Sequence, residues 1–333
     1  MYYSWLDRWD ERRTRRRDHE KRVTGLELDT ELAFPSARSS DGDEEFYRLA
    51  EQAVTDSPSF FGLDDCLPQT GREDVWLSFP SSVATETIDN NTVRAKLTTA
   101  KASNHALVVF HHWNARSRNS QLAKFFAWRG FAVFEIAMPY HLERVRPGST
   151  HADYMLSPNL GRTVRSIRQA VVDGRQLIRI LKRDGYDKVS VLGISLGSWV
   201  AGLIAAHEPA VTKATLFLTA GNLADMVWTG SATRHIRTSL EGSIDLARLR
   251  RAWAPLSLSS YPERLARPGL ELQMVLARRD RVVLPDLSQD LIARIEHAGV
   301  KPMVQWVNCG HYSLSLPPYI LSAGISASKF LNA

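Results

Sequence analysis

The sequence contains little cysteine, and this scarcity excludes several classes of protein. Only Cys66 and Cys309 occur in 333 residues, and they are far apart in the chain. Two such cysteines provide neither a disulfide framework nor the paired spacing of a zinc site. Free thiols are typical of a reducing compartment. We therefore expect a cytoplasmic protein that holds no metal.

The chain also lacks long apolar runs. Because no stretch of about 18 uncharged apolar residues is present, we expect no transmembrane helix. The opening residues, MYYSWLDRWDERR, contain no apolar core of a secretory signal peptide. Hydrophobic residues still make up 44% of the sequence, which is enough for a sizeable core and argues against global disorder.

The basic excess of the chain is uneven, and the N-terminus is one place where it gathers. The whole chain has a net charge of +6, and residues 1–22 contain eight arginines or lysines against five acids. The acids among these basic residues reduce the positive charge that could bind the phosphates of a nucleic acid, so we expect no nucleic-acid partner. Two interpretations stay open for residues 1–22: a solvated or frayed chain end, or a weak contact with an anionic membrane surface.

The chain changes character near residue 65. Residues 1–65 are charged and contain the loop signal ARSSDGDEE, which predicts an N-terminal extension with one or two helices. The following segments DVWLSF and TVRAKLTT alternate enough to predict two early strands, in an antiparallel hairpin at a sheet edge. We assign residues 66–333 to one α/β domain.

Short, fully apolar runs recur from residue 105 onward and are typical of buried parallel strands. They are ALVVF, FAVFEIAM, KVSVLGI, TLFLT, LELQMVLA and MVQWVN. Helical patterns separate them, the clearest of which has Val164, Ile167, Val171 and Ile178 on one face. This order predicts a doubly wound, mostly parallel sheet with helices on both faces.

One connection is longer than such a sheet requires. About 50 residues separate TLFLT from LELQMVLA, whereas a compact α/β unit needs only one helix there. We expect residues 222–265 to form a helical lid over the carboxyl edge of the sheet, where ligands bind in folds of this kind.

The stretch VLGISLGSW places Ser195 between Gly193 and Gly197, after a strand pattern and at the start of a helix pattern. A sharp strand-to-helix turn strains the backbone of its central residue, and side chains two positions away would collide. Glycine at both positions removes the collision, and the turn pushes the serine hydroxyl out above the sheet. The pattern by itself predicts either a nucleophile or a small residue in a tight turn.

Two later loops favour the nucleophile. Asp280 follows LELQMVLA and His311 follows MVQWVN, so both are expected at the same sheet edge as Ser195. A serine hydroxyl needs a neutral imidazole to take its proton, and the imidazole needs a carboxylate to fix its tautomer. The order Ser, Asp, His is the one that this architecture uses. We expect His311 as the base and Asp280 as the acid. Asp225 and Asp286 also lie near strand ends and are alternatives for the acid.

A further set of candidates follows the strand pattern ALVVF, where the sequence reads His111, His112, Trp113, Asn114. We expect the backbone N–H of Trp113 to pair with that of Leu196 as an oxyanion hole. The histidine side chains are expected to pack and to form supporting hydrogen bonds. A zinc site on this pair is not expected, because adjacent residues of an extended strand point to opposite faces.

These motifs resemble those of the α/β-hydrolase superfamily, over roughly residues 75–333. The strongest parts are VLGISLGSW, ARRDRVV and NCGHYS. The segments AMPYHLERVRPGS and LGRTVRSIRQAVVDGRQLI look like a branch of bacterial esterase-like proteins with eukaryotic relatives linked to phospholipid deacylation. The resemblance implies an α/β-hydrolase fold in which Ser195 is the nucleophile, Asp280 the acid and His311 the base, with no cofactor.

The resemblance also implies supporting residues. Trp113 and Leu196 would be the oxyanion donors, and Tyr140 and His141 would line the substrate pocket. The sequence departs from the family at HHW, where many members have a His-Gly pair. The bulky His112 would then narrow the space for the acyl group in the pocket.

Three functions are compatible with these motifs. The first is a serine hydrolase that cleaves carboxylic esters of small molecules through an acyl-enzyme intermediate. The second is a phospholipid or acylglycerol deacylase whose basic N-terminus meets anionic headgroups. The third is a non-catalytic binding protein on a hydrolase scaffold. The complete set of Ser195, Asp280 and His311 favours the first.

Overall fold

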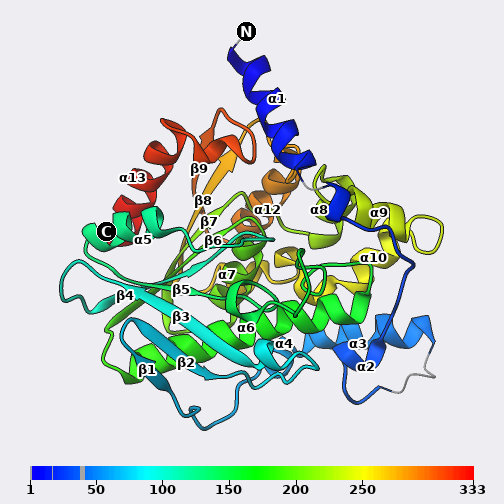
Figure 1. Ribbon diagram of the computed structural model, residues 1–333, viewed down its shortest axis with the longest axis horizontal. Coiled ribbons are helices and arrows are strands. Elements are labelled where there is room, and N and C mark those ends of the chain that lie inside the picture. The colour runs from blue at the N-terminus through cyan, green and yellow to red at the C-terminus, as the bar shows by residue number, and fades with distance from the viewer. Residues whose placement is uncertain (1, 17, 38–41) are drawn as a thin grey trace.

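The computed structural model of the chain describes residues 2–16, 18–37 and 42–333. A nine-stranded sheet crosses the molecule, with helices on both of its faces (Figure 1). The strand order across the sheet is β1-β2-β3-β5-β4-β6-β7-β8-β9. The strands are β1 (Gly71–Glu73), β2 (Trp76–Pro80), β3 (Thr92–Thr98), β4 (His105–Phe110), β5 (Ala132–Ile136), β6 (Lys188–Ile194), β7 (Val211–Phe217), β8 (Glu271–Ala277) and β9 (Met303–Val307).

The strands β4 to β9 form the parallel part of the sheet. They coincide with the six apolar runs predicted as buried strands. Every residue of β5 is buried, and in β4 and β6 only terminal residues are partly or fully exposed. These strands show no polar alternation because helices pack against both faces.

The predicted antiparallel hairpin is confirmed beside this parallel part. β2 and β3 pair antiparallel, with Leu77 opposite Ala95. β3 then pairs antiparallel with β5 and joins the hairpin to the parallel strands. β1, which the sequence did not predict, pairs with β2 and forms the outer edge.

The helices cover the two faces of the sheet as separate layers. They include α5 (Ser120–Trp128), α6 (Leu160–Arg183), α7 (Leu196–His207), α12 (Pro285–His297) and α13 (Tyr319–Asn332). α6, α7 and α12 contribute to a large core on one face, and α5 and α13 contribute to a smaller core on the other. The predicted doubly wound sheet is therefore confirmed.

The longest helix, α6, forms where the apolar spacing predicts a helix. Val164, Ile167 and Ile178 are fully buried on it. The side chain of Asn159 accepts the N–H of Arg162 at 2.9 Å and caps the first turn. α6 is the long green helix of Figure 1, and many of its residues belong to the larger core.

The N-terminal region contains more helices than the one or two expected for residues 1–65. They are α1 (Tyr2–Arg15), α2 (Thr30–Ala33), α3 (Asp43–Thr55) and α4 (Ser57–Phe60). Phe46, Tyr47 and Phe61 are buried in the larger core, so α3 and the residues after α4 pack on the α/β domain. Residues 38–41, part of the predicted loop ARSSDGDEE, lie outside the described residues.

The long connection between β7 and β8 is helical. It comprises α8 (Leu223–Thr229), α9 (Arg234–Leu240), α10 (Leu246–Ala252), the short turns η4 (Ala254–Leu256) and η5 (Leu258–Ser260), and α11 (Pro262–Leu265). Trp253 and Leu256 are fully buried, and Arg251 of α10 pairs with Glu51 of α3 at 3.0 Å. Residues 222–265 thus pack between the core and α3, and their action as a lid stays a prediction.

The structure also bears on the expectations about membrane-spanning helices and about the two cysteines. Among the described residues, no helix is both long and apolar enough to cross a bilayer. Cys66 is exposed and Cys309 is buried, and both are free thiols. The cytoplasmic location stays a prediction.

Candidate active site

Ser195 lies in the turn that joins β6 to α7, with φ 54° and ψ −124°. A positive φ is rare for a residue with a side chain and signals a strained backbone. The turn can form because Gly193 and Gly197 have no side chains. A Cβ on Gly197 would overlap the carbonyl oxygens of Phe110 and His111, and a Cβ on Gly193 would overlap the backbone of Gly197.

Gly197→Ala should therefore damage both stability and activity. The new methyl group would meet backbone carbonyls that cannot rotate away, and overpacking of this kind costs about 1–3 kcal/mol. We expect a lower urea midpoint of unfolding and a large loss of any ester turnover. Gly25→Ala is the control, because a Cβ there meets nothing within 4 Å. Equal stability of the two variants would contradict the steric argument.

Three side chains from different loops meet at this turn. His311, in the loop after β9, has Nε2 3.0 Å from the Oγ of Ser195 and Nδ1 2.7 Å from Oδ2 of Asp280. Asp280 lies in the loop after β8. Of the alternatives for the acid, Asp225 pairs with Arg250 at 2.6 Å instead, and Asp286 lies in the first turn of α12.

The second oxygen of Asp280 fixes the orientation of the carboxylate. Oδ1 accepts the backbone N–H groups of Val282 and Val283, each at 2.8 Å. Oδ2 is then directed at His311, and both side chains are largely buried, with Asp280 4% and His311 9% exposed. A carboxylate beside Nδ1 holds the proton on that nitrogen, so Nε2 presents a lone pair to the hydroxyl of Ser195.

The two expected oxyanion donors lie in segments that adjoin this turn, and their role stays a prediction. Leu196 is the first residue of α7, where a backbone N–H has no acceptor within its own helix. Trp113 lies in the loop after β4, and this loop is held against α7 because Gly197 contacts the carbonyl of His111. Neither N–H is paired with an acceptor in the described part of the chain.

Two neutral histidines accept backbone hydrogen bonds that connect the loop after β4 with the segment after β5. His141 accepts the backbone N–H of Asn114 at 2.9 Å, and His111 accepts that of Met138 at 3.2 Å. Asn114 itself has φ 59°. Burial lowers the pKa of His141 to about 3 and also lowers the pKa of His111. Both imidazoles therefore stay unprotonated acceptors at neutral pH.

Two of the expected pocket residues are placed differently from the prediction. Tyr140 and His141 are each 2% exposed. The hydroxyl of Tyr140 accepts a hydrogen bond from the guanidinium of Arg165 at 3.3 Å, and the ring of Tyr140 packs on Tyr154. Both side chains are thus occupied by protein partners and support the loops instead of lining a substrate pocket. His112 remains exposed beside the site, so its position in a pocket stays a prediction.

The fold of the chain was compared with known proteins. No protein-family model and no curated protein sequence matches it. Acetyl xylan esterase 1 from Thermoanaerobacterium sp. JW/SL YS485 is similar in structure, with a TM-score of 0.56 at 15% identity over 94% of this chain and 96% of that one. The chain has the α/β-hydrolase fold.

Other solved structures share this α/β-hydrolase fold. An esterase from Pyrococcus furiosus has a TM-score of 0.54 at 11% identity, over 83% of this chain and 93% of that one. An acylaminoacyl peptidase from Pyrococcus horikoshii has a TM-score of 0.59 at 10% identity, but this chain spans only 43% of its length. At these identities the comparisons establish the hydrolase fold and leave the reaction to be argued from the site.

Acid should destabilise this hydrolase fold through His141. The unfolded chain takes up a proton on this imidazole near pH 6.5, whereas in the folded protein burial lowers its pKa to about 3. The unfolded state then binds more protons, so stability falls as pH falls through this window. His141→Gln should remove about 1.4 kcal/mol per pH unit from the slope of the unfolding free energy between pH 6 and 4.5. Urea unfolding of the wild type and of His141→Gln at several pH values measures this slope. Identical slopes for the two proteins would contradict a neutral imidazole at His141 in the folded state.

The sequence analysis did not anticipate that α1 borders the site of the hydrolase fold. A small cavity of about 40 Å³ lies between α1, the loop with His311 and Tyr312, and the start of α9 with Arg234. From the other side, the ring of His235 in α9 stacks on Trp113 with centroids 6.0 Å apart. The site is therefore bordered by the N-terminal helix as well as by the 222–265 segment.

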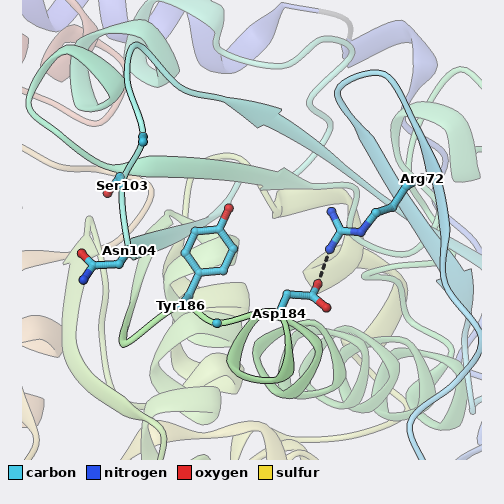
Figure 2. Close-up of a pocket in the computed structure, with 7 residues that line it drawn as sticks. Arg72, Ser103, Asn104, Asp184 and Tyr186 are labelled. Atoms are coloured by element: carbon cyan, nitrogen blue, oxygen red, sulfur yellow. Dashed lines mark hydrogen bonds and ion pairs between the residues drawn. The ribbon is translucent and has the colours of Figure 1, made fainter.

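A larger cavity of about 630 Å³ lies at the opposite end of the parallel strands (Figure 2). Arg72 and Asp184 form an ion pair in its wall, and Tyr186 stands on the loop that leads into β6. Its other residues, 102–104, precede β4. Ligands of doubly wound sheets bind at the carboxyl ends of the strands, so this cavity is separate from the candidate site.

The site contains no arrangement of metal ligands. In residues 2–16, 18–37 and 42–333, no group of three or more His, Cys, Asp or Glu side chains is placed to hold a metal ion. The chemistry that the site offers is that of a hydroxyl, an imidazole and a carboxylate in one hydrogen-bonded chain.

Proposed function

We propose that the protein is a serine hydrolase that cleaves carboxylic esters through an acyl-enzyme intermediate. The observation that carries this proposal is the hydrogen-bonded chain from Ser195 through His311 to Asp280, at 3.0 and 2.7 Å. Hydroxyl, base and orienting acid at these distances are what nucleophilic catalysis by serine requires. The esterase names of several structural neighbours agree with it.

The geometry suggests the order of proton transfers. Nε2 of His311 takes the proton of Ser195 as Oγ attacks the ester carbonyl, and Asp280 stabilises the imidazolium that forms. The imidazolium then gives its proton to the departing alcohol and leaves an acyl-serine. A water molecule, deprotonated by the same imidazole, releases the carboxylic acid and restores the hydroxyl.

The carbonyl oxygen becomes negatively charged in both steps. We infer that the N–H groups of Leu196 and Trp113 bind this oxyanion, because Leu196 follows Ser195 directly, Trp113 lies in the loop after β4 that contacts Gly197, and neither N–H has an acceptor in the described residues. The loss of one donor from such a hole costs about 3–4 kcal/mol of transition-state stabilisation. Esters are favoured over amides because an alkoxide leaving group demands less of the general acid.

The acyl group must lie beside Ser195, which is not among the residues that line the small cavity next to His311. We propose a short acyl chain on a small-molecule ester as the substrate, because such a chain needs the least space beside Ser195. A series of p-nitrophenyl esters from acetyl to palmitoyl tests this, with kcat/KM expected to be highest for the shortest members.

Labelling of the full chain with a fluorophosphonate probe tests the reaction class. We expect one labelled serine, Ser195, in competition with the ester substrate. A protein that folds but neither reacts with the probe nor hydrolyses any ester of the series would instead be a non-catalytic binding protein on a hydrolase scaffold.

A second candidate function, deacylation of phospholipids or acylglycerols at an anionic membrane, is favoured by one observation. The free end of α1 exposes Tyr2 (52%), Tyr3 (44%) and Trp5 (47%) on a helix that also carries exposed arginines. Aromatic rings with basic neighbours are typical of helices that lie in a membrane interface.

Vesicle sedimentation distinguishes this second candidate. It requires salt-sensitive binding to phosphatidylglycerol vesicles that is lost in Tyr2→Ser/Trp5→Ser but kept in Ile88→Ser, which removes a side chain 85% exposed on another element. It also requires kcat/KM to rise toward palmitoyl esters. Failure of either result leaves the small-ester hydrolase.

A further inference from the structure

The helix α1 is packed against the loop that carries His311. In Figure 1 it extends from the body of the molecule at its N-terminal end, and its other end reaches the region around β9 and α8. Leu6 of α1 is fully buried and Thr14 is 7% exposed, although most of the helix is polar. The helix is therefore docked along one side, and that side faces the candidate active site.

The centre of this contact is the carboxylate of Asp10. Its Oδ1 accepts the backbone N–H of Tyr312 at 2.7 Å and that of Ser313 at 3.0 Å. Its Oδ2 accepts the hydroxyl of Ser313 at 2.5 Å. That hydroxyl oxygen in turn accepts the N–H of Gly310 at 2.8 Å. Asp10 thus binds the backbone on the C-terminal side of His311 directly and on its N-terminal side through Ser313.

Glycine at position 310 permits this approach. A Cβ there would lie 2.5 Å from Oδ2 of Asp10 and 2.6 Å from its carboxyl carbon. The short loop therefore has no side chain between its backbone and the carboxylate. The carboxylate of Asp10 is partly buried and accepts from three donors, and each bond to a charged acceptor contributes more than a neutral one.

A second contact ties α1 to the loop that carries the acid. Arg279, next to Asp280, pairs with Asp7 through its guanidinium, with Nε 2.9 Å from Oδ1. The backbone N–H of Arg279 also donates to the carbonyl of Cys309 at 3.0 Å. One face of α1 therefore holds the loops after β8 and β9 together.

We propose that Asp10 is a positioning residue for acyl transfer, which fixes the loop of His311 so that Nε2 stays within hydrogen-bonding distance of the hydroxyl of Ser195. The inference rests on the proposed serine hydrolase function. Asp10 acts through the backbone and does not touch the reacting atoms. A displacement of about 1 Å in such a site can cost about 100-fold in rate.

The test compares Asp10→Ala with Asp10→Asn and a charge-matched control in the full chain. Glu45→Gln is the control, since Glu45 lies in α3, does not line the cavity beside His311, and pairs with Arg48 at the surface, at 2.6 Å. Turnover of p-nitrophenyl acetate is normalised to the serines labelled by a fluorophosphonate, so that misfolded protein does not count. The rate of labelling and the pH profile of kcat/KM are recorded as well.

We expect Asp10→Ala to lower kcat per labelled serine by about 10–100-fold with little change in KM, and to slow labelling by a similar factor. Asp10→Asn keeps an oxygen for the N–H groups of Tyr312 and Ser313, so it should recover most of the rate. Glu45→Gln should match the wild type. A purely structural role of Asp10 would lower the number of labelled serines and leave kcat per serine unchanged, which overturns the proposal.

Ser313→Ala and Ser195→Ala complete the test of the role of Asp10. If Asp10→Ala does not fold, Ser313→Ala removes the hydroxyl that links Asp10 to Gly310, and the same loss of kcat per serine is expected. An unchanged kcat per labelled serine in Ser313→Ala then overturns the proposal. Ser195→Ala runs in parallel: if it retains turnover, the hydrolase function itself fails, whereas an inactive Ser195→Ala beside a fully active Asp10→Ala rejects only the role of Asp10.

Discussion

Replacing Ser195 with alanine should abolish ester turnover while the protein stays folded. The change removes the only atom that forms the acyl bond in the proposed reaction, and losses of about 10⁶-fold in kcat are typical when a serine nucleophile is removed. The backbone at Ser195 has a positive φ in either case, and removal of a partly exposed hydroxyl leaves no cavity. Turnover of p-nitrophenyl acetate and urea unfolding of the purified variant measure the two effects.

The matched control is Ser231→Ala. Ser231 borders the same small cavity as His311, and its buried hydroxyl has no hydrogen-bond partner in the described residues. Loss of this hydroxyl should change kcat by less than about 3-fold, because it bonds neither Ser195 nor His311. Turnover that persists in Ser195→Ala at more than a trace would show that another group carries the reaction.

Asp280→Asn should have the second largest effect, about 10⁴-fold in kcat. The two backbone N–H groups of Val282 and Val283 must still be satisfied, so the oxygen of the new amide will occupy the place of Oδ1. The NH₂ group then faces Nδ1 of His311 and donates to it. Nδ1 becomes an acceptor, and the proton moves to Nε2, where it blocks the acceptance of a proton from Ser195.

The controls for Asp280→Asn are the same substitution at Asp225 and at Asp286, the two alternative acids of the sequence analysis. Asp225→Asn disturbs an ion pair with Arg250, and Asp286→Asn changes the first turn of α12. Neither touches His311, so both variants should keep kcat within about 3-fold of the wild type. Activity of Asp280→Asn above about one tenth of wild type would remove the orienting role that the tautomer argument assigns.

The sheet could be predicted from the sequence because each buried strand has its own local signal. Runs such as ALVVF and KVSVLGI are apolar at every position, and that pattern fits only a strand covered on both faces. The turn at Ser195 was also locally encoded, since Gly193 and Gly197 are the residues whose side chains would collide there. Loops just past strand ends then placed Asp280 and His311 at one edge by topology alone.

The contacts of α1 and of Tyr140 could not be predicted in the same way. Asp10 is one of several acids among arginines, and its partners, residues 310–313, lie some 300 positions later in the chain. No local pattern marks such a pairing. Tyr140 and His141 follow a strand end, as pocket residues often do, but the positive φ of Tyr140 turns its ring toward Tyr154 and the core.

The pairing of Asp10 with residues 312 and 313 has a consequence for biosynthesis. Helix α1 leaves the ribosome long before β9 and has no docking surface until β9 and the loop after it have been made. Contacts of such wide sequence separation form late, because they require the intervening chain to be ordered first. Activity should consequently appear only after residues 310–313 have left the ribosome. Nascent chains stalled before residue 310 should expose Leu6 and the aromatic rings of α1 to chaperones.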